Sequence, residues 1–251
     1  MSSNRKIYHL GNKLFKHCYP LYFPLYSAWK GFSDRSERRL LRRFLKPGMT
    51  MADVGANIGI YSCFFSRLVG PSGQVHAFEP AEENFAHLRE TTRDHGNITL
   101  NQAAVGERNG TLRLYMSDAL NVDHQTYDSG EGRRGVDVPV IALDAYFPPG
   151  RRLEFIKIDV QGFEMSVLKG AARVLAENAD IGVLMEFWPY GLRKAGSDPR
   201  DVIAFIRNLG FHVVTVSDSG CSVEDFLAGP AGIEDYCNVI LTRRATALPA
   251  V

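Results

Sequence analysis

Short apolar runs alternate with amphipathic stretches from Met51 onward, as in chains built from repeated strand–helix units. The apolar runs predict seven strands of one main sheet, at residues 50–54, 74–78, 98–102, 155–158, 181–187, 212–217 and 238–242. The amphipathic stretches predict helices at residues 58–69, 81–95, 164–169, 171–177 and 199–209. This alternation predicts an α/β fold with a largely parallel sheet.

Two segments depart from the alternation. Residues 111–146 contain two predicted strands, 111–116 and 136–141, on either side of a polar stretch, and we interpret them as an excursion that covers the active site. Residues 1–47 contain aromatic side chains interleaved with prolines and basic residues, and we expect a helical cap there. The alternative interpretations of residues 1–47 are a lid over the substrate and a surface that forms a homodimer. Residues 48–251 would form the catalytic domain.

Charge is distributed unevenly along a chain of 251 residues and net charge +1. Residues 1–50 hold eleven Lys and Arg against Asp34 and Glu37, a local charge of +9, so the remainder carries −8. Such asymmetry is found in nucleic-acid and membrane-surface elements. Because the basic residues are spread out, we interpret them as a solvated helical face.

The cysteines and the apolar segments indicate a cytoplasmic protein. Cys18, Cys63, Cys221 and Cys237 lie far apart and form no C-x-x-C pair, which disfavours a zinc site or a disulfide framework. The early apolar stretch, residues 18–29, contains two prolines and is too short to span a bilayer. We expect no export signal and no membrane span.

A glycine-containing turn at residues 53–59, DVGANIG, connects the first predicted strand to a helix. Gly55 and Gly59 permit a sharp turn and close approach to a ligand, and a helix start offers free N–H groups. Glu79 follows the next strand, where Rossmann-like sites hold ribose hydroxyls. A carboxylate there has little evident structural purpose, which favours a binding role. Asn57 stands where a dinucleotide site needs a glycine near the pyrophosphate, which disfavours NAD.

These motifs resemble the FkbM family of methyltransferases. The matching segments are residues 53–59, 77–80, 101–106, 138–144, 157–164 and 168–170, and Gln161 stands where the family usually has Glu. The resemblance implies a Rossmann-like class I methyltransferase: a seven-stranded, mostly parallel sheet of order 3-2-1-4-5-7-6, with an antiparallel last strand and helices on both faces. It also implies S-adenosyl-methionine as the cofactor, which carries no phosphate.

The resemblance further implies which residues contact this cofactor. Its amino-acid part would lie among Asp53, Gly55, Asn57 and Gly59. Its ribose would lie at Glu79 and Pro80, and its adenine beside Ala103, Ala104 and Val105. Asp53 has a second interpretation, in which its carboxylate only stabilises the turn.

Two carboxylates are predicted at the reacting centre. Asp159 ends the fourth strand and Glu186 lies near the end of the fifth, and strand order reverses beside the fourth. Methylation of a hydroxyl requires alignment of its oxygen and removal of its proton, for which Asp159, Glu186 and His124 are candidates. Alternatively, Asp159, Glu164 and Glu186 bind Mg²⁺, or Glu164 simply favours a helix start.

The predicted function is therefore O-methylation of a small-molecule hydroxyl, on a sugar, a polyketide or another natural product. The alternatives are an NAD(P)-dependent oxidoreductase and a non-catalytic module that binds S-adenosyl-methionine. Nucleic acid is not an expected partner, because the catalytic region is acidic and would repel phosphates.

Overall fold

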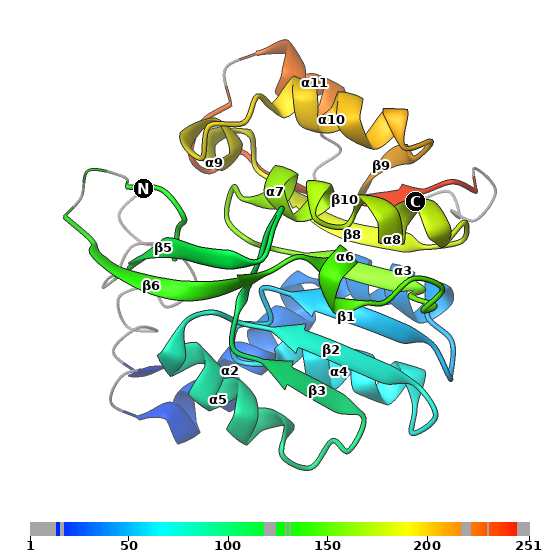
Figure 1. Cartoon of the computed structure of the whole chain (residues 1–251). Helices are drawn as coiled ribbons and strands as arrows, with labels where there is room; N and C mark the ends of the chain where they lie inside the picture. The colour runs from blue at the N-terminus through cyan, green and yellow to red at the C-terminus, as the bar shows by residue number, and fades with distance from the viewer. Residues whose placement is uncertain are drawn as a thin grey trace.

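A seven-stranded sheet forms the centre of the computed structural model, which describes residues 14–15, 18–117, 124–128, 130, 132–216, 222–229 and 231–244. Its strands are β1 (Thr50–Val54), β2 (Gln74–Phe78), β3 (Ile98–Asn101), β7 (Phe155–Ile158), β8 (Gly182–Phe187), β9 (His212–Val216) and β10 (Cys237–Thr242). Their order is β3-β2-β1-β7-β8-β10-β9, and β10 runs antiparallel to both of its neighbours (Figure 1). The predicted strand order and the antiparallel last strand are confirmed. Ser217 of the sixth predicted strand lies outside the described residues.

Helices cover both faces of this sheet. One face packs against α3 (Arg35–Phe44) and α4 (Ile60–Val69), and the other packs against α7 (Glu164–Lys169), α8 (Ala172–Glu177) and α10 (Pro199–Asn208). Because both faces are covered, the central strands are apolar almost throughout. The predicted helices are confirmed with ends that differ by one to a few residues, including α5 (Glu82–Thr92).

Three short helices were not predicted. They are α6 (Leu143–Tyr146), α9 (Pro189–Lys194) and α11 (Val223–Ala228). With four residues, α6 is too short for an apolar periodicity of 3.6 residues to be recognised, and α9 and α11 have six residues each.

A second, three-stranded sheet occupies the predicted excursion. Its strands are β4 (Ala104–Val105), β5 (Gly110–Met116) and β6 (Arg134–Ile141), in the order β4-β6-β5. It packs against Ala81, which follows the end of β2, so the small sheet lies at the carboxyl edge of the main sheet. The strand β4 was not predicted. Residues 118–123, 129 and 131 of the excursion lie outside the described residues.

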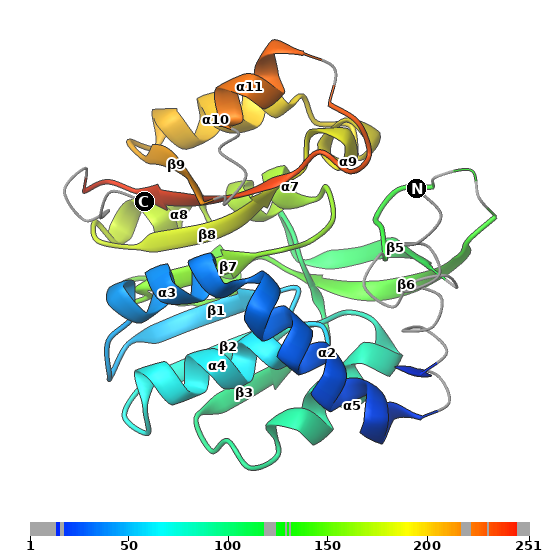
Figure 2. The ribbon, with the colours of Figure 1, turned by 180° about the vertical axis from the view of Figure 1, so that it is seen from behind.

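The N-terminal segment is helical, as predicted. Helix α2 (Tyr19–Ser33) continues into α3, and the two lie together on one side of the molecule in Figure 2. The inner face of α2 buries Tyr22 against Ile58 of the glycine turn, and Tyr19 stacks on His87 of α5 with ring centroids 3.6 Å apart. Residues 1–13, 16 and 17 of the predicted cap lie outside the described residues. Among the helices that are described, none has the length and apolarity needed to cross a membrane.

Candidate active site

The glycine turn brings the ends of β1 and β7 together. Gly55 and Asn57 have φ values of 78° and 50°, in the left-handed region. A Cβ atom on Gly55 would lie 1.9 Å from the carbonyl oxygen of Asp159, the residue that follows β7. The turn therefore lies in contact with a predicted catalytic residue, at the strand junction where ligands bind in open α/β sheets.

Asp53 is fully buried at the end of β1. Its Oδ2 accepts a hydrogen bond of 2.6 Å from the Ser62 hydroxyl, and its Oδ1 has no hydrogen-bond partner among the described residues. Burial raises the pKa of this carboxyl, and the nearby Lys157 ammonium opposes the shift. A buried, unpaired acceptor is costly unless it gains a donor. Asp53 is thus suited to hold a polar or cationic part of a ligand.

Lys157 was missed as a candidate, and it lies at the centre of this site. Its Nζ donates to Asp159 Oδ2 at 3.1 Å and lies 3.9 Å from Asp53 Oδ1. Burial favours the neutral amine, but the charges of Asp159 and Asp53 outweigh burial and raise the pKa of Lys157. A lysine inside a four-residue strand that is otherwise apolar was the available sequence signal, since charged residues are almost never buried unpaired.

Asp159 and Glu186 share a hydrogen-bond donor. The Gln161 side-chain amide donates both to Asp159 Oδ1, at 3.1 Å, and to Glu186 Oε2, at 3.0 Å. The neutral amide of Gln161 therefore links the two carboxylates by hydrogen bonds. A glutamate at this position would add a third negative charge and would repel both of them. It adopts a φ of 52° to do so.

The two linked carboxyls have opposite pKa shifts. Burial acts to raise the pKa of Asp159, but the charges of Lys157 and Lys30 outweigh it and lower that pKa. Burial and the neighbouring Asp159 charge raise the pKa of Glu186 well above its ordinary value. Pairs of carboxyls with opposed shifts are characteristic of acid–base sites, where one stays ionised and the other exchanges a proton.

The N-terminal helices reach this site through Lys30 and Asp34. Lys30 Nζ pairs with Asp34 Oδ2 at 3.0 Å, and the Tyr61 hydroxyl donates to the same Asp34 oxygen at 2.9 Å. The Tyr61 ring in turn lies 5.2 Å from Lys157 Nζ. A continuous chain of contacts therefore joins α2 to the catalytic candidates, which the sequence did not reveal.

Glu164 belongs to the turn rather than to a metal-binding group. Its Oε1 accepts from the backbone N–H groups of Val160, at 3.3 Å, and Gly162, at 3.2 Å. This agrees with the alternative that placed it at a helix start. Among the described residues no group of three or more His, Cys, Asp or Glu side chains is arranged to hold a metal ion. The geometry thus gives no support to the predicted Mg²⁺ set of Asp159, Glu164 and Glu186.

Burial of Glu164 makes stability depend on pH. Its Oε2 has no hydrogen-bond partner among the described residues, and burial raises its pKa to about 7. The pKa of this carboxyl is higher in the folded state than in the unfolded state. Its contribution to stability is therefore fully present at a pH below the unfolded-state pKa, and it is lost as the pH rises through the folded-state pKa of about 7.

Because Gln does not titrate, the free energy of unfolding of Glu164→Gln should not show this dependence on pH. The difference between the variant and the wild type should shift in favour of the variant by about 2 to 3 kcal/mol as the pH rises from 4.5 to 8. Urea denaturation at several pH values measures this difference. The exposed Glu107→Gln variant is the control, and its difference from the wild type should stay flat. A flat difference for Glu164→Gln would contradict the assigned burial cost.

Glu79 has a structural role that the sequence analysis did not anticipate. Its Oε2 accepts from Asn57 N and its Oε1 accepts from Ala81 N, both at 2.9 Å. The carboxylate thus connects the glycine turn to the start of α5 by hydrogen bonds. The assumption that Glu79 has little structural purpose was wrong. Burial raises its pKa to about 7, against the effect of these hydrogen bonds. Pro80 lies between these contacts.

The remaining predicted residues lie in or beside the small sheet. Ala103, Ala104 and Val105 are buried, and the last two form β4 rather than a turn. His124 lies beside the end of β5, where its Nδ1 accepts from Ser117 N at 3.1 Å. His124 is thus on a different element from Asp159 and Glu186. Residues 121–123, which precede it, lie outside the described residues.

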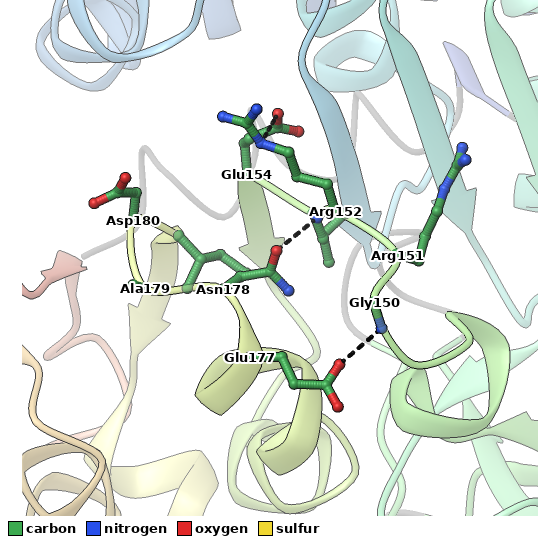
Figure 3. A pocket seen from close by; sticks show the side chains of 10 residues that line it. Gly150, Arg151, Arg152, Glu154, Glu177, Asn178, Ala179 and Asp180 are labelled. Atoms are coloured by element: carbon green, nitrogen blue, oxygen red, sulfur yellow. Dashed lines mark hydrogen bonds and ion pairs between the residues drawn. The ribbon is translucent and has the colours of Figure 1, made fainter.

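A separate cavity of about 340 Å³ lies at the opposite edge of the sheet (Figure 3). It is lined by residues 150–154, which precede β7, and by residues 177–181, which precede β8. Several of its charged side chains already have partners: Arg152 pairs with Glu154, Glu177 accepts from Gly150 N at 3.3 Å, and Asp180 pairs with Arg244. Because it adjoins the amino ends of the strands, it is not the candidate active site.

The strand order, the antiparallel last strand and the site at the β1–β7 junction define a class I methyltransferase fold. Residues 53–213 match the Methyltransferase FkbM domain, and the chain belongs to this family. The match covers the glycine turn, Glu79, Asp159 and Glu186. Membership of a methyltransferase family disagrees with the nicotinamide-dependent alternative.

Individual relatives agree with this assignment. The chain is 28% identical to the hexuronic acid methyltransferase AglP of Haloferax volcanii, over 69% of each protein. It is 30% identical to the 31-O-demethyl-FK506 methyltransferase FkbM of Streptomyces tacrolimicus, over 69% of this chain and 76% of the relative. Among solved structures, a Streptococcus mutans methyltransferase in complex with SAH has a TM-score of 0.51 at 12% identity, covering 82% of this chain and 94% of the other. That similarity shows the fold.

Proposed function

We propose that this methyltransferase transfers a methyl group from S-adenosyl-methionine to a hydroxyl oxygen of a small molecule, such as a sugar, a polyketide or another natural product. The observation that carries the proposal is the Asp159–Gln161–Glu186 group, in which two carboxyls with opposed pKa shifts lie beside the glycine turn. The named activities of two relatives, on a hexuronic acid and on 31-O-demethyl-FK506, support a hydroxyl-bearing acceptor.

The residues around the glycine turn fit the proposed cofactor. Asp53 Oδ1, which accepts no hydrogen bond from the described residues, offers an acceptor for its ammonium group, and Gly55, Asn57 and Gly59 leave the turn without bulky side chains. Glu79 and Pro80 would contact the ribose, and Ala103 to Val105 would adjoin the adenine. When bound, S-adenosyl-methionine supplies an electrophilic methyl group on a sulfonium.

The chain itself would orient the acceptor and accept its proton. We assign proton acceptance to Glu186, because its raised pKa makes its carboxylate the stronger base of the pair. As the methyl group moves from the sulfonium sulfur to the acceptor oxygen, which would leave S-adenosyl-homocysteine, the hydroxyl proton would pass to a Glu186 oxygen. Asp159, kept ionised by Lys157, would hold the hydroxyl in line for this transfer. His124 is the remaining candidate base, beside the end of β5.

Calorimetric titration with S-adenosyl-homocysteine and NAD, in parallel, tests the cofactor. We expect binding of S-adenosyl-homocysteine alone, whereas binding of NAD alone would overturn the proposal. A panel of hydroxylated sugars, macrolides and simple alcohols, assayed with a labelled methyl donor, then tests the acceptor class. Activity restricted to amines in that panel would exclude O-methylation and leave methyl transfer intact. Binding without any transfer would favour the non-catalytic alternative.

Glu79→Ala is expected to weaken S-adenosyl-homocysteine binding about tenfold to a hundredfold. The substitution removes a charged acceptor from the ribose hydroxyls, and hydrogen bonds to charged groups contribute about 1.5 to 3 kcal/mol. It also frees the N–H groups of Asn57 and Ala81, so thermal unfolding must be measured beside calorimetry. Glu154→Gln, at the opposite sheet edge, is the control. A destabilised variant with undiminished affinity would leave Glu79 with only its structural role.

Magnesium remains an untested prediction. The geometry of Asp159, Glu164 and Glu186 gives it no support, and methylation of an alcohol needs only alignment and a base. We expect methyl transfer to survive exhaustive chelation. Activity that is lost on chelation and restored by Mg²⁺ would contradict this expectation.

The functional division of the chain is also a proposal. Residues 1–47 would serve as a cap or lid on the catalytic domain of residues 48–251, and residues 111–146 would cover the active site. Deletion of residues 1–32 tests the lid, which predicts a loss of acceptor affinity. A homodimer through the aromatic N-terminal segment would show in sedimentation. The cytoplasmic location stays a prediction; Cys18 and Cys63 are free thiols.

A further inference from the structure

The outer face of α2 exposes a stripe of large apolar side chains. Leu21, Leu25, Trp29 and Phe32 are 50%, 57%, 50% and 70% exposed. Their spacing of four, four and three residues places them on one side of the helix. The adjoining side of α2, which carries Tyr19, Tyr22 and Tyr26, packs against Ile58 of the glycine turn, whereas the stripe itself is at least half exposed. Contiguous exposed apolar groups of this kind mark interaction surfaces.

A basic face continues this apolar stripe along α3. The exposed side chains Arg35, Arg39, Arg42, Arg43 and Lys46 recur at helical spacing. The Arg35 guanidinium lies 4.9 Å from the centre of the Phe32 ring, which joins the two faces. We call this combined surface the α2–α3 face.

The acidic residues of this region do not neutralise the α2–α3 face. Asp34 is buried and engaged with Lys30 and Tyr61, on the inner side. Glu37 accepts a hydrogen bond of 3.0 Å from the Asn238 side chain, toward the sheet. The exposed charge of this face is therefore positive, beside a stripe of Leu, Trp and Phe.

We propose that the α2–α3 face docks on an anionic lipid bilayer, with the α2 stripe in the interfacial region and the α3 arginines at the headgroups. A helix with Trp, Phe and Leu on one side and basic residues beside them is typical of proteins that bind to the membrane interface. Each Lys or Arg near an anionic surface adds favourable electrostatic energy. Nucleic acid would use the arginines and leave the leucines exposed to water.

A second copy of the chain is a less favourable occupant than a bilayer. A two-fold dimer places the same patch of both protomers together. The α3 arginines of one protomer would then approach those of its partner, and like charges at an interface are repulsive. An anionic bilayer satisfies both the apolar stripe and the basic face.

Docking also has a consequence for the acceptor, and this step rests on the proposed function. The inner side of α2 packs on the glycine turn and carries Lys30, whose charge acts on both Asp159 and Glu186. A bilayer on the outer side of α2 would lie one helix away from the reacting centre. An acceptor that is itself amphiphilic or lipid-linked would then be presented close to its site.

Co-sedimentation of the full chain with vesicles tests docking without any need for catalysis. We expect binding to vesicles of equal phosphatidylcholine and phosphatidylglycerol, and at least about tenfold weaker binding to pure phosphatidylcholine. The double variant Leu25→Gln/Trp29→Gln should lose at least about tenfold in binding. Its control is Ile233→Gln, an apolar side chain that is 62% exposed elsewhere, which should bind as the wild type.

Two double variants that remove basic residues measure the electrostatic contribution to binding separately from the apolar contribution. Arg39→Gln/Arg43→Gln should bind anionic vesicles about thirtyfold more weakly, at roughly 1 kcal/mol per basic residue. The control Arg108→Gln/Lys169→Gln removes the same charge from other exposed positions. Docking is overturned if anionic vesicles do not sediment the protein, or if stripe and control variants bind alike. A dimer that Leu25→Gln/Trp29→Gln dissociates in analytical ultracentrifugation would also overturn it, in favour of a second copy.

Discussion

Gly55→Ala is expected to lower the free energy of unfolding by about 3 to 5 kcal/mol and to abolish binding of S-adenosyl-homocysteine. Gly55 has a φ of 78°, which costs an L-residue about 1 to 2 kcal/mol. Its new Cβ would also lie 1.9 Å from the Asp159 carbonyl oxygen, a backbone atom that cannot rotate away. The ends of β1 and β7 would have to separate, and with them Asp53, Lys157 and Asp159.

Gly196→Ala provides a matched control for this prediction. Gly196 has a φ of 84°, but no atom lies within 4 Å of the position that its Cβ would take. Its substitution should therefore cost only the conformational part, about 1 to 2 kcal/mol. Urea denaturation measures both variants. Equal losses would show that the β1–β7 contact is looser than described.

Glu186→Gln is expected to lower kcat about a thousandfold, within the range of 10² to 10⁴ that a positioned general base contributes. S-adenosyl-homocysteine affinity should change little, because that ligand engages the glycine turn rather than the acceptor's proton. The pH profile gives a second readout. Because burial and Asp159 raise the pKa of Glu186, wild-type activity should fall as pH falls through that raised value. The variant should lose this dependence.

The control for Glu186→Gln is Glu154→Gln. Glu154 lies just before β7, at the opposite edge of the sheet, and pairs with Arg152 at 2.8 Å. Its kcat should stay within about threefold of the wild type. If Glu186→Gln behaved in the same way, proton acceptance would pass to Asp159 or His124. The comparison requires the acceptor identified by the hydroxyl panel.

The main sheet was predictable because each of its strands has its own local signal. Runs such as residues 181–185 are apolar on both faces and are flanked by turn residues or helical periodicity. Local signals fail where an element is too short to show a period, as in β4 with two residues and α6 with four. The order of the strands came from the resemblance rather than from the pattern.

The site was predictable where its residues end strands, and less so where they meet across strands. Asp159 and Glu186 were found because carboxylates follow apolar runs. The amide of Gln161 that links them depends on a left-handed turn, and the Lys157–Asp53 approach depends on β7 lying beside β1. The structural role of Glu79 was missed because its partners are backbone N–H groups, which every residue except proline has and which therefore cannot be recognised in the sequence.

The position of β10 in the sheet constrains how the chain folds as it is synthesised. β10 lies between β8 and β9, although it follows both in the chain. Until residues 237–242 leave the ribosome, one edge each of β8 and β9 remains without its hydrogen-bond partner. Unpaired, apolar strand edges are sites of aggregation, and contacts between distant residues form slowly. Completion of this sheet therefore comes late in the folding of this domain, and the nascent chain depends on protection of those two edges until it occurs.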